Sequence, residues 1–347
     1  MKEEEKKMKR LSSIVILLVL TLFVFSGITY AKNYEMVIGL TDAADPEISP
    51  IYKGELVFKN YVEGKSQGRI GVKIIPGGAL GDATSTLKQV MNGTIQGTLN
   101  PSEGVIAQFY NPIQVVGIPY LVSDMEVGYE LLDSPFFEEL WEDMRKELGV
   151  VTLSAIENNG LRHFTNNVRP IKSPKDVKGL KIRTMQIPAH MKMVEALGGH
   201  PTPITWAELY TSLQTNVVDG QENSLVAINI GKLQEVQKYL SIDGHLFGVI
   251  PFLVNEKWYN SLPDDLQKII KRGAKLAAIT VRGTIRYKTV ELLDELEKNL
   301  EIYYPTQEEL QEFKNATQQP VIEFLKETVD SKWIDGVLEE VKEIEQR

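Results

Sequence analysis

Short apolar runs alternate with amphipathic stretches along the first half of the chain. Runs that predict buried strands lie at residues 35–40, 69–76 and 94–99. The stretches between them, residues 51–65 and 83–91, have the apolar spacing of helices. This alternation predicts a mostly parallel α/β sheet, in which ligands bind in the loops beyond the carboxyl ends of the strands. Those loops are residues 41–45 and 100–104.

A second α/β unit begins near Asn158. Its expected elements are residues 179–184, 190–197 and 206–214. Within the last of these, Thr205 and Glu208 have the spacing of a capping box, which predicts a helix that begins at Trp206. Trp206 would then either line a pocket or anchor the helix to the sheet. Residues 217–220 predict a strand that ends in a turn, and the polar cluster at residues 221–223 is more typical of a helix cap than of a site.

The C-terminal part contains one long helical stripe. No proline occurs from Asp264 to Leu300, and the apolar residues that recur at three- and four-residue steps are Leu266, Ile270, Ala274, Ala277, Val281, Ile285, Leu292, Leu296 and Leu300. Such a helix would span on the order of 55 Å, more than one small domain needs. Because Gly273, Gly283 and Lys288 interrupt the stripe, we expect one helix laid across both units rather than a coiled coil.

The N-terminus has the three-part order of a secretory signal peptide. Residues 1–10 contain four lysines and one arginine, residues 11–25 are almost entirely apolar, and small residues follow up to Ala31. We therefore expect residues 1–31 to be cleaved and the mature protein to be extracytoplasmic. The alternative is an uncleaved membrane anchor, for which the apolar run is short. Lipid anchoring through an N-terminal cysteine is excluded because the chain contains no cysteine.

Charge and composition narrow the function classes. The whole chain carries −9, and residues 1–31 contribute +5 and −3, so the mature part carries −9 − 2 = −11. This balance argues against nucleic acid and anionic membrane surfaces as partners. If the ligand is an anion, local positive charge must hold it. The absence of cysteine also excludes disulfides and thiol-bound metal.

Two arginines are candidates for an anion clamp. Arg162 lies in a strand-like stretch, and Arg183 lies in another, where strand alternation places it on the face opposite Leu180 and Ile182. A single arginine in such a place is most often a solvated charge. Two at the ends of neighbouring strands favour a clamp, because a guanidinium fork binds a carboxylate through two hydrogen bonds, which lysine cannot do.

The sequence lacks the common signatures of an enzyme. It contains no Gly-x-Ser-x-Gly, no His-Glu-x-x-His and no Walker loop. The histidines that could bind a metal, His163, His190, His200 and His245, lack metal-site spacing. We therefore expect a binding protein with no catalytic residues, no metal and no cofactor.

Seven segments together resemble the periplasmic substrate-binding subunits of tripartite ATP-independent periplasmic (TRAP) transporters, the C4-dicarboxylate-binding family. They are residues 78–82, 118–120, 179–185, 201–210, 213–215, 218–223 and 235–240. The resemblance covers essentially the whole mature chain. It implies a two-lobed α/β fold of the Venus-flytrap type, with hinge strands and a long C-terminal helix that spans both lobes.

The resemblance also implies where the lobes lie. Lobe I would comprise residues 32–158 and 248–283, and lobe II residues 159–247 and 284–347. The hinges would lie near residues 158–160 and 245–249, with bending of the long helix near Gly283.

Site roles follow from the resemblance residue by residue. It implies that Arg183 is the principal carboxylate clamp, that Arg162 is a second cationic contact and that Asn223 donates to the same carboxylate. Trp206 would lie beneath the ligand, and Gln186 would be a further polar contact. Lobe I departs from the sialic-acid receptors, since Ala83 follows Asp82 where they have an acid, so sialic acid is not the expected ligand.

The expected function is capture of a small organic carboxylate (a C4-dicarboxylate, a sugar acid or a related acid) and its delivery to the integral-membrane subunits of an ion-gradient-driven TRAP permease. The alternatives are a binding protein of an ATP-driven transporter and a sensor that presents its ligand to a signalling partner.

Overall fold

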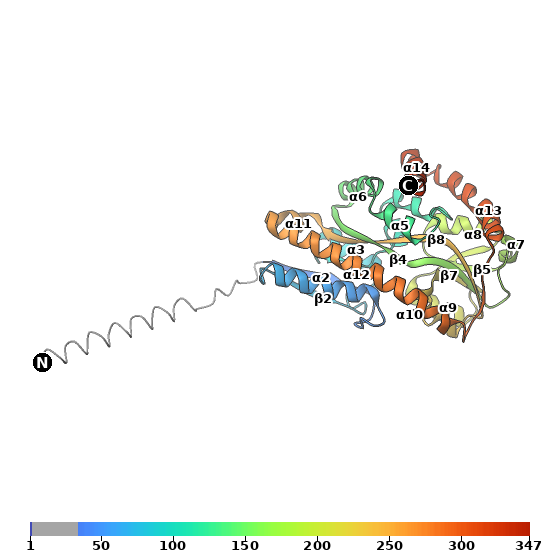
Figure 1. Ribbon diagram of the computed structural model, residues 1–347, viewed down its shortest axis with the longest axis horizontal. Helices are drawn as coiled ribbons and strands as arrows, with labels where there is room; N and C mark the ends of the chain where they lie inside the picture. Colours follow the sequence, from blue (N-terminus) through green and yellow to red (C-terminus); the bar gives the residue numbers. More distant parts are fainter. Residues whose placement is uncertain (2–33) are drawn as a thin grey trace.

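The computed structural model describes Met1 and residues 34–347 (Figure 1). The predicted signal peptide, apart from Met1, falls outside the described residues. Within the part of the chain that is described, no helix has the length and apolar character needed to cross a bilayer.

The described strands form one mixed sheet. They are β1 (Tyr34–Gly39), β2 (Ile70–Ile75), β3 (Gly97–Thr98), β4 (Val150–Asn166), β5 (Lys181–Thr184), β6 (His200–Pro203), β7 (Gly220–Ser224), β8 (Tyr239–Asn255) and β9 (Glu301–Tyr303). Their order is β2-β1-β3-β8-β4-β7-β5-β6, and β9 pairs with β8. β1 pairs in parallel with β2 and β3, and β5 pairs in parallel with β6 and β7, as the strand–helix alternation predicts.

Two long strands join the two ends of this sheet. β4 and β8 each contain 17 residues and run antiparallel to one another. β3 pairs with the end of β8 near Val254, whereas β7 pairs with the opposite end of β4, at residues 162–166. Each long strand therefore belongs to both lobes, and the two-lobed α/β fold is confirmed.

The ladder between the long strands is interrupted midway. Its register shifts between Glu157 and Leu161, and Asn159 and Gly160 have φ of 63° and 110°. Left-handed backbone is costly for any residue except glycine, so this interruption is a defined feature of the fold. It coincides with the hinge position predicted at residues 158–160.

Helices and short 3₁₀ turns connect the strands. They are α2 (Pro50–Lys65), α3 (Ala83–Asn92), α4 (Glu103–Ile106), η1 (Asn111–Gly117), α5 (Met125–Leu132), α6 (Pro135–Leu148), α7 (Pro174–Val177), α8 (Pro188–Ala196), α9 (Trp206–Gln214), α10 (Leu225–Ile230), η2 (Leu233–Glu235), α11 (Glu256–Ser261), α12 (Asp264–Leu296), α13 (Gln307–Leu325) and α14 (Ser331–Glu345). Within the described part of the chain, buried apolar side chains form three clusters. One is shared by β1, α2 and α12, and in it the rings of Phe58 and Phe252 lie 4.8 Å apart.

The predicted long helix is a single element, α12, of 33 residues. It runs across the molecule from α11 to the region of α9 and α10 (Figure 1). Its buried residues include nearly all of the predicted stripe, from Leu266 to Leu296. Gly273 does not break the helix because α2 packs against it closely: a Cβ there would lie 2.9 Å from Val62. The helix ends at Leu296 rather than Leu300, since a short turn and then β9 follow.

The strand predicted at residues 217–220 is misplaced. Residues 217–219 form the turn, and the strand β7 begins at Gly220 and contains the polar cluster. Every residue of β7 is buried, because the strand pairs with β4 on one side and with β5 on the other. The buried side chains of β7 are polar and are paired within the fold. The strand therefore lacks the apolar alternation by which a strand is predicted from sequence.

Candidate functional site

A cavity of about 540 Å³ opens between the two lobes. On the side of lobe I it is lined by loops that follow β1, β2 and β3, including both loops predicted to bind ligand. On the side of lobe II it is lined by β4, β5, β7 and the start of α9. All five predicted site residues line it: Arg162, Arg183, Gln186, Trp206 and Asn223.

Arg183 is the cation of this cavity that forms no ion pair among the described residues, although the nearby carboxylate of Glu222 acts on it electrostatically. It lies on β5, its side chain is 3% exposed, and its Nε donates to the carbonyl of Ile204 at 2.9 Å. Its Nη1 is buried and has no hydrogen-bond partner within the described part of the chain. Burial lowers the pKa of Arg183 to about 10, so the guanidinium is still charged at neutral pH. An unpartnered charged donor in a cavity is suited to an anionic oxygen.

Arg162 is different because its charge is already compensated. Its Nη2 donates to Oε1 of Glu222 at 2.9 Å and to the Glu222 carbonyl at 2.7 Å, and its Nε donates to Oε2. Both side chains are at most 1% exposed. The sequence predicted Arg183 as the principal clamp and Arg162 as a second cationic contact, but it did not predict that Arg162 is paired with Glu222 while Nη1 of Arg183 has no partner among the described residues.

The other predicted residues also present polar or aromatic groups to the cavity. The backbone N–H of Ser224 donates to Oδ1 of Asn223 at 3.2 Å, which leaves the amide nitrogen of Asn223 as a donor. Gln186 accepts a hydrogen bond of 3.4 Å from Gln108, which comes from lobe I, so this pair connects the two sides of the cavity. Trp206 is 43% exposed, and its ring edge lies over Gly231, where a Cβ would come within 2.8 Å.

Trp206→Ala is expected to weaken ligand binding by roughly 1–2 kcal/mol, because an aromatic ring that lines a pocket loses its contact area on truncation. The unliganded protein should lose less stability than this, since nearly half of the side chain is already exposed. Calorimetric titration and urea unfolding of the same variant measure the two quantities. Equal losses would instead make Trp206 an anchor for α9.

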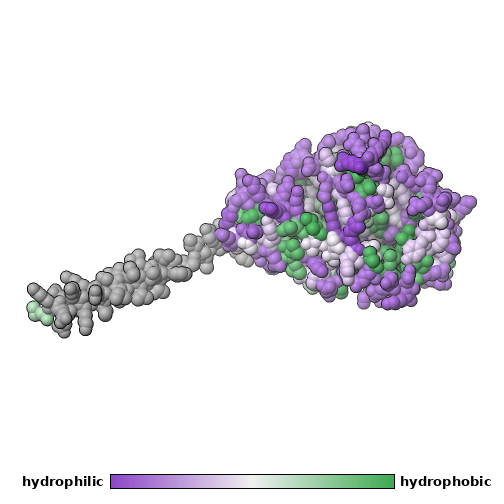
Figure 2. Space-filling model, in the orientation of Figure 1, coloured by the Kyte–Doolittle hydropathy of each residue, from purple (hydrophilic) through white to green (hydrophobic). Residues whose placement is uncertain are grey.

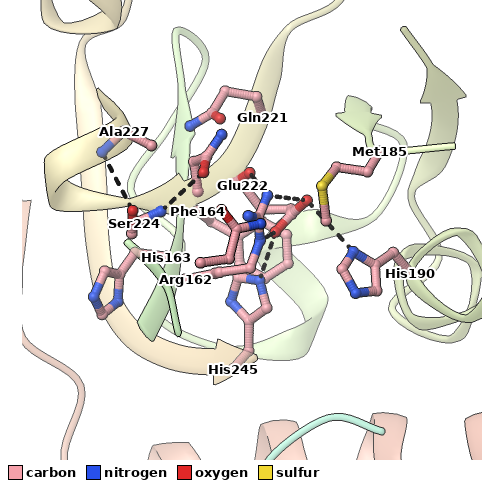
Figure 3. A network of polar contacts seen from close by, with 12 residues as sticks. Arg162, His163, Phe164, Met185, His190, Gln221, Glu222, Ser224, Ala227 and His245 are labelled. Carbon is pink, nitrogen blue, oxygen red and sulfur yellow. Dashed lines mark hydrogen bonds and ion pairs between the residues drawn. The ribbon is translucent and has the colours of Figure 1, made fainter. Parts of the chain in front are cut away.

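Arg162 and Glu222 belong to a buried network that the sequence did not reveal (Figure 3). His245 contacts Glu222 through Nε2 at 3.5 Å and Asp243 through Nδ1 at 2.7 Å, and its ring stacks on Phe164 with centroids 4.2 Å apart. His190 lies 3.9 Å from the other oxygen of Glu222. The available signal was the two-residue spacing of Asp243 and His245, which places both on one face of a strand.

The histidines near Glu222 differ in charge. Burial alone would lower the pKa of His245, but Asp243 and Glu222 together raise it to about 9. For His190 burial prevails and lowers the pKa to about 3. At neutral pH His245 is therefore cationic and His190 is neutral. The carboxylate of Glu222 therefore contacts two buried cations, Arg162 and His245.

The raised pKa of His245 predicts that the free energy of unfolding depends on pH. The pKa of His245 in the folded state is above the ordinary value of about 6.5, so its contribution is fully present below that pH and is lost as the pH rises toward 9. The contribution should be about 3 kcal/mol at most. Urea unfolding of wild type and His245→Gln at several pH values measures it: the gap between them should narrow from pH 6 to pH 9.5. A gap that stays constant would contradict a charged His245.

The side of the cavity that belongs to lobe I is largely polar, and its described lining residues include no lysine or arginine. Thr41 donates to Oδ1 of Asn100 at 2.7 Å, and the amide nitrogen of Asn100 is buried without a partner among the described residues. Burial raises the pKa of Asp42, which accepts from Ser49 at 2.6 Å. Among the described residues that line the cavity, Arg162 and Arg183 are the only lysines or arginines. No cluster of three metal-binding side chains occurs in the described residues.

Comparison with known proteins shows the family of the chain. Residues 42–328 match the family model of the bacterial extracellular solute-binding proteins, family 7. The chain belongs to this family. A solute-binding protein of Verminephrobacter eiseniae is 34% identical over 252 residues, which cover 70% of this chain and 74% of that protein. The resemblance to TRAP receptors drawn from the sequence is thus confirmed.

Solved structures of TRAP-type receptors have the same fold. The sugar acid binding protein DctPAm of Advenella mimigardefordensis, in complex with galactonate, has a TM-score of 0.83 at 29% identity and covers 89% of this chain and 98% of its own. A TRAP periplasmic solute-binding protein of Desulfovibrio salexigens, with bound orotic acid, has a TM-score of 0.83 at 26% identity and covers 90% and 99%.

Proposed function

We propose that this solute-binding protein captures an organic acid with one carboxylate and several hydroxyl groups, and delivers it to a TRAP permease in the membrane. One observation carries the proposal: among the described residues that line the cavity, Arg183 is the only cation that forms no ion pair, and the opposite side of the cavity is polar and partly acidic. A carboxylate would accept hydrogen bonds from Nη1 of Arg183 and from the amide nitrogen of Asn223. Charge-assisted bonds of this kind contribute roughly 1.5–3 kcal/mol each.

The charge distribution favours a sugar acid over a C4-dicarboxylate. A second carboxylate would lie toward lobe I, where the cavity is lined by Asp42 and Asp82 and by neutral polar groups. A buried anion without a cation is costly, whereas hydroxyl groups both donate and accept and suit carboxylate and amide partners. The galactonate bound by the Advenella protein has this chemistry.

Closure of the lobes around the ligand is part of the proposal. The lobes would be those predicted, residues 32–158 with 248–283 and residues 159–247 with 284–347, hinged where the β4–β8 ladder is interrupted. Two contacts bridge the lobes beside the cavity: Gln108 with Gln186, and Ser102 with Met185 at 3.8 Å. A ligand that contacts both sides favours the closed form by its differential affinity for it.

Delivery rather than catalysis is the proposed outcome of binding. The protein would act outside the cytoplasmic membrane, after cleavage of residues 1–31, as a receptor and not as an enzyme. Family membership supports the ion-gradient-driven permease as partner over an ATP-driven transporter or a signalling partner.

A thermal-shift screen with matched acids tests the proposal. Aldonates and uronates should raise the melting temperature, since a ligand at a hundredfold excess over Kd adds about 2.7 kcal/mol to stability. Succinate and malate should raise it far less. Stabilisation by C4-dicarboxylates and none by polyhydroxy monocarboxylates would refute the charge argument. Conversion of any bound acid into product would refute the receptor assignment.

A further inference from the structure

The solvent-facing side of α12 carries an apolar stripe that no described element covers. Leu276, Ile279, Tyr287 and Val290 are 37%, 66%, 67% and 73% exposed. They are separated from one another and from Gly283 by three- and four-residue steps, so all five residues lie on one face of the helix. In Figure 2, green residues lie along the course of α12. None of the stripe residues lines the cavity between the lobes.

The stripe is symmetric about Gly283. Leu276 lies seven residues before it and Val290 seven after it (283 − 276 = 290 − 283), and Ile279 and Tyr287 lie four residues to either side. A two-fold axis through Gly283 would place Leu276 against Val290 of a second copy, and Ile279 against its Tyr287. An isologous interface requires this kind of self-complementary surface. A surface for an unrelated partner has no reason to be symmetric.

Gly283 itself suits the centre of such a contact. A Cβ built on it meets nothing within 4 Å, so the glycine is not required by packing inside its own chain. Glycine costs roughly 1 kcal/mol in the middle of a helix relative to alanine. Small residues at a helix crossing point let two backbones approach closely.

Charges at the two ends of the stripe are also complementary in an antiparallel pair. The exposed residues nearest to it include the basic residues Lys268, Lys271, Arg272 and Lys275 before it and the acidic residues Glu291, Asp294, Glu295 and Glu297 after it, while exposed Asp264 and Asp265 lie further out on the first side and Lys298 on the second. Arg272 and Asp294 are equidistant from Gly283, at eleven residues each. Neither forms an ion pair within the described part of the chain. Antiparallel packing would bring basic and acidic ends together, whereas parallel packing would oppose like charges.

We propose that two copies of this chain form a two-fold symmetric dimer through antiparallel packing of their α12 helices, with the axis at Gly283. One helix pair buries less than the roughly 1,200–2,000 Å² of a stable interface, so the dimer should be weak and form at micromolar concentrations or above. The proposal goes beyond ligand capture and does not depend on it.

Sedimentation velocity of the exported, processed protein from about 1 µM to about 500 µM tests the dimer. Wild type should show concentration-dependent dimerisation, and Gly283→Arg should abolish it by blocking the helix approach. Gly64→Arg is the matched control, because Gly64 is an exposed glycine on α2 whose Cβ would likewise meet nothing within 4 Å. The control should dimerise as wild type does. Circular dichroism should show both variants to be folded.

Charge reversal tests the antiparallel register. Arg272→Asp and Asp294→Arg should each weaken the dimer at least about tenfold, because each places like charges opposite one another twice. Mixing the two variants should restore a heterodimer in which both contacts are attractive, and the double variant should restore a homodimer.

Cross-linking gives an independent measurement. The chain has no cysteine, so an oxidised Gly283→Cys protein can form only an intermolecular disulfide, which requires Cα atoms about 4.4–6.8 Å apart. It should cross-link faster than Gly64→Cys. A wild type that is monomeric over the whole range, with equal cross-linking of the two variants, would overturn the proposal. If Gly283→Arg then impaired transport alone, the stripe would be assigned to the permease.

Discussion

Arg183→Ala is expected to weaken binding of the carboxylate ligand by roughly 2–5 kcal/mol, because the anion would enter a desolvated cavity without its cation. Arg162 cannot substitute, since Glu222 already occupies its Nε and Nη2. Arg183→Lys should rescue little, because an ammonium lacks the planar fork. Isothermal titration with the acid identified by the thermal-shift screen measures both effects.

Arg183→Ala should leave the unliganded protein as stable as wild type or make it more stable. Arg183 is a buried charge with an unpartnered nitrogen, and its lowered pKa reports the cost of burying it. Lys181→Ala is the matched control, since Lys181 lies on the same strand but is exposed and absent from the cavity. The clamp assignment is wrong if Arg183→Lys binds within a few-fold of wild type, or if Lys181→Ala loses as much affinity.

Local patterns predicted much of the fold. The spacing of apolar residues on α12 was read correctly because a helix is determined by neighbours three and four positions apart. The end at Leu296 was missed because Leu300 continues the spacing, although the chain turns there to form β9. The 17-residue length of β4 and β8 was also missed. Their ladder joins residues as far apart as Val150 and Asn255, and such non-local pairing leaves no local signal.

In the site, too, local features were predictable from the sequence and contacts between distant residues were not. Strand ends and loops led to the correct side of the sheet, and all five predicted residues line one cavity. The different states of Arg162 and Arg183 were not predictable, because they depend on Glu222, which is 60 residues away from Arg162 along the chain. β7 was not predicted as a strand because its residues are polar. Glu222 is stable in this buried strand only because Arg162 and His245, which are distant in sequence, are buried beside it.

The second prediction with a large expected effect concerns the buried network of Glu222, Arg162 and His245. Glu222→Gln is expected to destabilise the unliganded protein by roughly 3–5 kcal/mol, because two buried cations would lose their common counter-charge. Burial alone would raise the pKa of Glu222, but Arg162, His245 and His190 hold it well below its usual range. Its contribution to stability is therefore present above about pH 4.5 and is lost as the pH falls.

Urea unfolding of a double-mutant cycle separates the lost ion pair from a simple packing defect. Arg162→Met alone should also be strongly destabilising, because it leaves Glu222 with less compensation, whereas Arg162→Met combined with Glu222→Gln should cost clearly less than the sum of the two single changes. Glu142→Gln, on the exposed surface of α6, serves as the control and should unfold as wild type does. Additive losses in the cycle would mean that Arg162 and Glu222 stabilise the fold independently, and that pairing with Glu222 is not what holds Arg162 in place beside the cavity.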